Sequence, residues 1–308
     1  MILCCGEALI DMLPRDTRSG EDGFVPYVGG AVFNTAIALG RLGVSTSFFT
    51  GISTDHFGQQ LQDALAASHV EPGYIHLSNR PTTLAFVRLK EGHASYMFYD
   101  ENTAGRMLTL DDLPTLGDDV AALHFSCISL IPEPCGSTYE ALMRREKDKR
   151  VIMFDPNIRK DFIPDYASHL ARMNRMLEMA DIVKLSDEDL AWFGETGNHE
   201  EIARRWLQRA PKLVIVTMGS KGIAGFTRDH SIVVKGEAVK VEDTVGAGDT
   251  VNAGLLAYLS DNALLTKSAV AQLSEDQLRS ALAFANRAAS VTVSRAGANP
   301  PWRHELNG

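Results

Sequence analysis

Residues 241–254, with the sequence VEDTVGAGDTVNAG, are the part of this chain best suited to bind an anion. Gly246, Ala247 and Gly248 carry little or no side chain, so the backbone can turn tightly and approach a ligand closely. The apolar residues that follow predict a helix over 247–260, whose first N–H groups have no partner within the helix. These donors and the helix dipole together favour a phosphate at this position.

Asp249 lies inside this predicted anion site, where a carboxylate is out of place unless it takes part in chemistry. It can accept the proton of a hydroxyl group that attacks the phosphate. The alternative is an acidic helix start that merely follows a glycine turn. The preceding Asp243-Thr244 pair and the apolar continuation over 253–259 favour the functional interpretation.

Composition limits the class of protein. The chain has 308 residues, of which 45% are hydrophobic and 22% charged, as in ordinary globular proteins. This length fits one large α/β domain with an appendage, or two domains. The net charge of −9, without a block of Lys or Arg, argues against nucleic acid or an anionic membrane surface as partner. No apolar run approaches the length of a membrane span.

The cysteines indicate a reducing compartment. They include an adjacent pair and lack CxxC spacing, so we expect buried thiols in the cytoplasm and not disulfides or a zinc site; they are Cys4, Cys5, Cys127 and Cys135. The N-terminal residues lack a basic segment and soon reach Glu7, so no signal peptide is expected.

Short apolar runs alternate with amphipathic segments along most of the chain. The first run, 2–5, predicts a buried strand that continues through 7–13, with Asp11 just beyond its end. Further strands are expected at 47–50, 122–126, 151–154, 182–185 and 213–217. Helices are expected after Gly29-Gly30 and at 57–65, 136–148, 168–179, 187–194, 199–209, 247–260 and 275–294. This alternation predicts an α/β fold with a mostly parallel sheet that helices cover on both faces.

The alternation is interrupted between residues 80 and 103. Two β-type runs surround Lys90-Glu91-Gly92-His93, which predicts a hairpin. We interpret it as an inserted small sheet, with the Pro- and Gly-rich segment 14–28 as a loop or edge partner. A second β pair is expected at 223–227 and 231–240. Without repeats or a separating linker, we expect one domain over 1–308.

Polar residues follow three of the predicted parallel strands, where α/β sheets bind ligands. These segments are 155–159 (DPNIR), 184–189 (KLSDED) and 217–222 (TMGSKG). Each alone can be a turn, or in the case of Ser186 a helix N-cap. Their common position beside an anion site favours a ligand site. The chain lacks GxxxxGK[ST], a GxGxxG after the first strand, HExxH and GxSxG, which argues against P-loop, dinucleotide-binding, zinc and serine-hydrolase chemistry.

Two motifs resemble those of the ribokinase-like (PfkB-type) carbohydrate kinases: residues 29–36 (GGAVFNTA) and 243–250 (DTVGAGDT). The resemblance covers essentially the whole chain. Residues 6–11, 155–159 and 183–189 are most similar to bacterial fructokinases. The resemblance implies a ribokinase-like, Rossmann-like α/β fold. The inserted strands, from about 14–28 and 80–103, would form a lid over the sugar that in relatives often builds a dimer.

The resemblance also implies roles for single residues. Asp249 would be the catalytic base, and Gly246, Ala247 and Gly248 would form the anion hole. Positions near the sugar are Asp11, Gly29, Gly30, Asn34, Asn157 and Arg159. Positions of the nucleotide site are Ser186, Thr217, Gly219, Ser220, Lys221, Gly222, Gly248 and Asn286. A monovalent-cation site would use the side chain of Asp243 and the backbone of Val245, Thr292, Arg295 and Gly297.

Two positions depart from the family pattern. The Asn-x-x-Glu linked to magnesium reads Ser186-x-x-Asp189 here, and the shorter Asp189 would reach the metal through water. The aromatic residue that usually follows Gly-Asp-Thr is Val251, which we interpret as a packing change. Neither departure removes a catalytic group.

The expected function is therefore ATP-dependent phosphorylation of D-fructose, with Mg²⁺ and K⁺ as ions and no nucleic-acid or membrane partner. Alternatives are a kinase of 2-keto-3-deoxygluconate, of ribose or of a nucleoside, and a non-catalytic sugar sensor. In ketodeoxygluconate kinases an Arg follows the lid tyrosine, whereas here Asp100 and Glu101 follow Tyr99. Two acids at this place would repel a carboxylate, which favours a neutral sugar.

Overall fold

The computed structural model of the chain describes residues 1–90 and 93–306. Its larger sheet has the strand order β14-β13-β12-β11-β10-β9-β1-β4-β5, with β6 also paired to β4. The parallel strands are β1 (Ile2–Cys5), β4 (Thr46–Ser53), β5 (Val70–Glu71), β6 (Ile75–Ser78), β9 (Ala122–Ser126), β10 (Val151–Asp155), β11 (Ile182–Ser186) and β12 (Leu213–Thr217). Two antiparallel strands, β13 (Ile223–Phe226) and β14 (Ser231–Val234), complete one edge. The mostly parallel sheet is thus confirmed.

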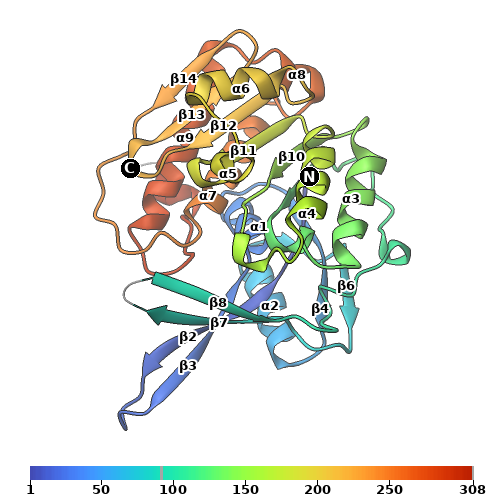
Figure 1. Cartoon of the computed structure of the whole chain (residues 1–308), viewed down its shortest axis with the longest axis vertical. Coiled ribbons are helices and arrows are strands. Elements are labelled where there is room, and N and C mark those ends of the chain that lie inside the picture. Colours follow the sequence, from blue (N-terminus) through green and yellow to red (C-terminus); the bar gives the residue numbers. More distant parts are fainter. Residues whose placement is uncertain (91–92, 307–308) are drawn as a thin grey trace.

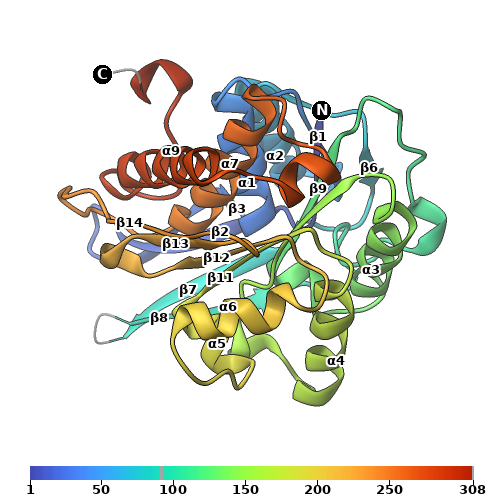
Figure 2. The same ribbon diagram turned by 90° about the horizontal axis from the view of Figure 1, so that it is seen from above.

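Helices cover both faces of this sheet (Figure 2). One face carries α1 (Ala31–Arg41), α2 (His56–Ala67), α7 (Ala247–Asp261) and α9 (Glu275–Val293). The other carries α3 (Cys135–Glu146), α4 (Tyr166–Leu177), α5 (Asp187–Trp192) and α6 (His199–Leu207). The short helix α8 (Lys267–Ala271) precedes α9, and 3₁₀ helices lie at Leu110–Asp112, Cys127–Leu130, Lys160–Phe162, Gly219–Lys221 and Arg303–Leu306. Because both faces are covered, strands such as β10 are buried along their whole length.

Helices α1, α7 and α9 pack closely beneath the site. Gly254 of α7 lies so near α9 that a Cβ atom there would be 2.7 Å from the Cα of Ala285. Val251 is 4% exposed and belongs to the same core, in agreement with the packing role expected for it. In the described part of the chain, no helix combines the length and the apolar character that crossing a membrane requires.

The second sheet has the order β3-β2-β7-β8 and projects from the body of the molecule (Figure 1). Its strands are β2 (Leu9–Asp16), β3 (Asp22–Gly29), β7 (Leu84–Lys90) and β8 (His93–Tyr99). We call this four-stranded sheet the lid sheet. The expected hairpin of β7 and β8 is confirmed, except that residues 91–92 of its turn lie outside the described residues.

Two expectations about strands were wrong. β1 ends at Cys5 and a separate strand, β2, begins at Leu9, so Asp11 lies inside a strand and not just beyond a strand end. β14 ends at Val234, and 235–240 forms no strand. For segment 14–28, the edge partner was the correct alternative, because β3 pairs with β2 at the edge of the lid sheet.

Candidate active site

A cavity of about 300 Å³ lies between the lid sheet and the ends of the parallel strands. It brings together residues that are far apart in the sequence: Asp11 from β2, Asn34 from α1, and Asp249 from α7. The loop after β10 adds Asn157 and Arg159. The cavity is also lined by Gly30, Gly246 and Gly248, so the predicted sugar and anion residues share one space, with Gly29 directly beside it.

Asp249 is the best-defined group of this cavity. Its side chain is buried, and its Oδ2 accepts a hydrogen bond of 2.9 Å from Nδ2 of Asn34. The hydroxyl of Thr35 donates to the backbone oxygen of Asp249 at 3.3 Å, so α1 holds both the side chain and the backbone of this residue. Burial raises the pKa of Asp249 to about 7, against the opposing effects of Asn34 and Lys184. A carboxyl group with a pKa near neutrality is suited to accept a proton at physiological pH.

The turn before Asp249 has the backbone expected of an anion site. Gly246 is the N-cap of α7 in the left-handed region, with φ 76°, and a Cβ there would lie 2.8 Å from that of Ala298. The amide of Ala247 makes a long turn bond of 3.3 Å to Thr244. The amides of Gly248 and Asp249 belong to the first helical turn, where helices leave N–H groups unpaired. They can therefore donate to a ligand at the helix end.

The sugar side of the cavity depends on two carboxyl groups before α1. Asp11 fills the space in which Gly29 would otherwise carry a Cβ atom, and burial raises the pKa of Asp11 to about 6. Glu7, which sequence reasoning missed, accepts from the amides of Ala31 at 2.8 Å and Val32 at 3.4 Å. Glu7 therefore caps α1. The sequence held one signal for this cap: α1 begins after Gly29 and Gly30, and a glycine N-cap has no side chain to cap the helix, so another residue must do so.

The predicted nucleotide residues gather at the neighbouring strand ends. Ser186 of β11 and Thr217 of β12 are paired in register. Residues Gly219–Lys221 form a 3₁₀ helix directly after β12, and Gly222 follows with φ 105°. Asn286 of α9 donates to the backbone oxygen of Lys235 at 3.0 Å, which places it near the same edge. Their assignment to a nucleotide stays a prediction.

Ser186 and Asp189 form a capping box at the start of α5. One oxygen of Asp189 accepts from the amide and hydroxyl of Ser186, both at 2.7 Å, and the other accepts from the amide of Ile158 at 2.7 Å. Asp189 is 4% exposed. Both residues thus have a structural role, and contact of Asp189 with a metal through water stays a prediction.

The predicted monovalent-cation residues are brought partly together. Asp243 accepts from the amides of Val245 at 3.0 Å and Gly297 at 2.9 Å, so it joins these two loops. The hydroxyl of Thr292 bonds that of Thr250 at 2.9 Å, below the turn. Arg295 directs its side chain to Glu305 at 2.6 Å, which leaves its backbone for the role expected. Their assignment to a monovalent cation stays a prediction.

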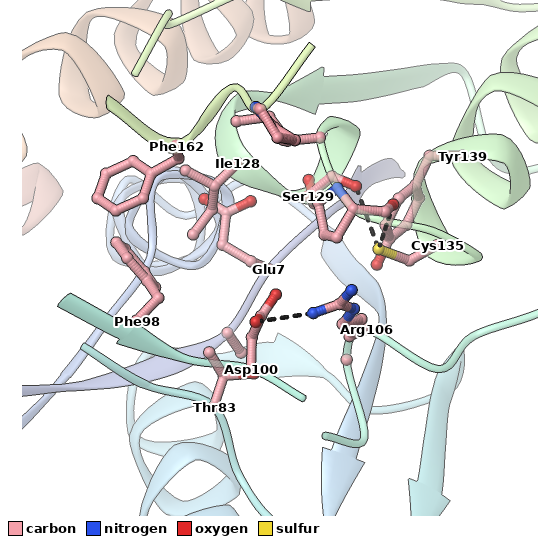
Figure 3. A pocket seen from close by; sticks show the side chains of 15 residues that line it. Glu7, Thr83, Phe98, Asp100, Arg106, Ile128, Ser129, Cys135, Tyr139 and Phe162 are labelled. Atoms are coloured by element: carbon pink, nitrogen blue, oxygen red, sulfur yellow. Dashed lines mark hydrogen bonds and ion pairs between the residues drawn. The ribbon is translucent and has the colours of Figure 1, made fainter. Parts of the chain in front are cut away.

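A second cavity, of about 320 Å³, adjoins the first on the side of α3 (Figure 3). Phe98 of the lid sheet and Phe162 of the core line both cavities, and their ring centroids are 4.4 Å apart. Asp100 forms an ion pair with Arg106 at 2.9 Å in the wall of this cavity. Of the two acids expected to repel a substrate carboxylate, Asp100 thus has its charge balanced by Arg106.

The site thus combines an anion-binding helix start, a buried carboxyl group and a polar cavity of sugar size. The family model described as "pfkB family carbohydrate kinase" matches residues 1–305. This chain belongs to the pfkB family of carbohydrate kinases.

Proteins similar to this kinase include several fructokinases. One from Rhizobium leguminosarum bv. trifolii is 60% identical over 91% of this chain and 86% of its own length. The crystal structure of a fructokinase with bound ATP from Xylella fastidiosa has a TM-score of 0.90 at 28% identity, covering 99% of this chain and 97% of that one. A double mutant of the fructokinase from Vibrio cholerae O395, in its fructose, ADP and potassium ion bound form, has a TM-score of 0.83 at 28% identity, covering 96% and 93%.

The raised pKa of Asp249 predicts how its replacement changes stability with pH. Between about pH 4 and 7, the unfolded chain ionises Asp249 while the folded kinase keeps it protonated, so stability is lost as pH rises and the loss levels off above about pH 7. Asp249→Asn removes this loss. Its free energy of unfolding in urea should match the parent kinase at about pH 4 and exceed it by a few kcal/mol at about pH 8. A difference that is constant across this range would contradict the assigned pKa.

Proposed function

We propose that this kinase transfers the γ-phosphoryl group of ATP to a hydroxyl group of D-fructose, with Asp249 as general base. The observation that carries the proposal is the buried Asp249, held by Asn34 at the start of a helix whose free amides favour phosphate. The fructokinase that is 60% identical and the fructose-bound and ATP-bound structures support the choice of substrates.

In this mechanism the two substrates meet at Asp249. Fructose occupies the first cavity, with Asp11 and Asn34 accepting and donating hydrogen bonds to its hydroxyl groups. Asp249 accepts the proton of the attacking hydroxyl while the amides at the start of α7 bind the phosphoryl oxygens. Arg159, exposed at the rim of the cavity, adds positive charge there. Phosphoryl transfer needs this positioning and charge neutralisation more than covalent help.

ATP would bind along the carboxyl ends of β11 and β12. Ser186 and the turn from Thr217 to Gly222 would hold the nucleotide, with Asn286 beside it. Mg²⁺ would neutralise the phosphate charge, with Asp189 reaching it through water. K⁺ would be held by Asp243 and nearby backbone oxygens, and would fix the geometry of the turn that forms the anion hole.

The lid sheet has two further proposed roles. Covering the sugar, it would exclude water that competes as phosphate acceptor. Several of its large apolar side chains are exposed, namely Phe24, Val25, Tyr27, Met97 and Tyr99. A homodimer formed through this sheet would bury them. We place the kinase in the cytoplasm, where its four buried thiols stay reduced.

The first test is the variant Asp249→Asn. It keeps the size and the contact with Asn34 but cannot accept the proton, so kcat should fall by at least about 100-fold. ADP release with D-fructose measures this, and Asp229→Asn, an exposed acid in the turn between β13 and β14, is the matched control that should keep full activity. If Asp249→Asn retains more than about a tenth of kcat, the base is another group.

The second test separates neutral from acid sugars. Three acids, Glu7, Asp11 and Asp249, line the first cavity against one arginine, Arg159. Arg106 is already paired with Asp100, so a substrate carboxylate would find weak charge support. We expect kcat/KM for D-fructose to exceed that for 2-keto-3-deoxygluconate by more than about 100-fold, or about 2.7 kcal/mol.

The variant Asp100→Asn sharpens this comparison. This substitution removes the ion-pair partner of Arg106, which can then bind a substrate carboxylate. The ratio of kcat/KM for D-fructose to that for 2-keto-3-deoxygluconate should therefore fall. A comparable or reversed ratio in the parent kinase would assign it to acid sugars. Ribose and a nucleoside in the same panel test the remaining sugar kinases, and a lack of turnover with every sugar would indicate a sensor.

The third test concerns the ions. Activity should require Mg²⁺ and rise with K⁺, because Asp243 joins the loops of Val245 and Gly297 on either side of the proposed cation. The rate is compared in K⁺ and in tetramethylammonium at equal ionic strength. Equal rates in the two salts would exclude the monovalent-cation site.

A further inference from the structure

Lys184 is a buried cation that the mechanism above does not use. It lies in β11 with its side chain 5% exposed, and its Nζ donates to Oδ2 of Asp155 at 3.0 Å. The same oxygen accepts from Nδ2 of Asn252 at 2.7 Å. Asn252 is three residues beyond Asp249 in α7, so the two lie on one side of that helix. Asp155 therefore ties Lys184 to the helix that carries the base.

The ammonium group of Lys184 lies directly behind the anion hole. A Cβ atom on Gly248 would come within 2.9 Å of Nζ, closer than real side chains approach. Gly248 is part of α7 and does not adopt the left-handed conformation, so the turn itself does not demand glycine here. The ammonium group of Lys184 therefore lies directly beside Gly248, and a side chain at position 248 would have to displace it.

We propose that Lys184, held by Asp155 and Asn252, is a positioning residue that places a fixed positive charge behind Gly248 of the anion hole. There it stabilises negative charge on the transferring phosphoryl group and on Asp249. This inference rests on the proposed function and extends it to a residue outside the two sequence motifs.

The surrounding charges agree with this placement. Burial alone would lower the pKa of Lys184, but Asp155, Asp189 and Asp249 raise it above its ordinary value, so the group stays charged. Burial and the charge of Lys184 lower the pKa of His124 to about 3, so the imidazole is neutral. His124 lies in β9, on the other side of β10 from β11. The groups that act on Asp249 from the elements around it are Asn34, Lys184, Asp155 and Arg159.

The competing explanation is an ion pair that only holds β10 to β11. Buried ion pairs can be replaced by neutral groups without loss of stability, whereas removal of one partner leaves a costly unpaired charge. We therefore compare Lys184→Met, which leaves Asp155 unpaired, with the double variant Asp155→Asn/Lys184→Met. The double variant carries no charge at either position, and the amide introduced at position 155 still has an oxygen that can accept from Asn252.

The steady-state kinetics of the two variants separate the explanations. Our proposal expects the double variant to recover the folding stability that Lys184→Met loses while its kcat stays lower than that of the parent by about 10-fold or more. KM for D-fructose should change by less than about 3-fold, because Lys184 is not among the residues that line the sugar cavity. If the ion pair were only structural, the double variant would recover kcat together with folding stability. That result would overturn the proposal.

A second readout needs no substrate. The pH at which Asp249 titrates is obtained from the unfolding of each protein with and without Asp249→Asn. Adding Lys184→Met to Asp155→Asn should move this titration to higher pH, because the ammonium that favours the ionised carboxylate is lost. An unchanged titration would overturn the proposal. If no sugar is phosphorylated, the proposed function fails, whereas this measurement still decides whether Lys184 acts on Asp249.

Discussion

The hydrogen bond between Asn34 and Asp249 is the interaction on which the rest of the site depends. It joins α1, which begins where β3 of the lid sheet ends, to α7, which begins at the anion hole. A buried carboxylate is costly, and the bond from Asn34 supports the ionised form against the effect of burial. The same contact places Oδ2 of Asp249 between the proposed sugar-binding residues and the anion hole. Close packing of α7 on α9 at Gly254 keeps that atom in place.

The sequence predicts the central sheet well because its signals are local. Strands β9 and β12 have the predicted bounds, since short apolar runs between polar turns define them. The boundary between β1 and β2 was missed for a tertiary reason. A Cβ atom on Gly6 would lie 2.4 Å from the side chain of Val32, so α1 packs against the chain just after β1 ends, a contact distant in sequence. Likewise β14 ends where Gly236 packs against the backbone of Ser220, a contact distant in sequence.

The same distinction holds within the site. The sequence motifs predicted Asn34 and Asp249, and the resemblance of segment 6–11 predicted Asp11. The structure brings all three to one cavity. Glu7 and Lys184 lie in segments that the sequence singled out, but their roles were not predicted because the fold determines their partners. The ion pair of Asp100 with Arg106 was likewise not predicted, because it depends on how the loop after the lid sheet folds. Ionisable side chains are thus predicted by type, but their charge balance requires the packed structure.

The glycines of the two motifs carry this lesson furthest. Gly29 lacks a Cβ where the carboxylate of Asp11 lies, Gly30 where the backbone and side chain of Glu7 pass, and Gly248 where the ammonium of Lys184 lies. In each case a charged residue from another element occupies the volume that a side chain would fill. Conformational freedom alone explains Gly246 but not Gly248, which is helical. These three glycines therefore lie where ionisable residues from other elements approach the backbone, and at position 248 that residue is the buried Lys184 beside the anion hole.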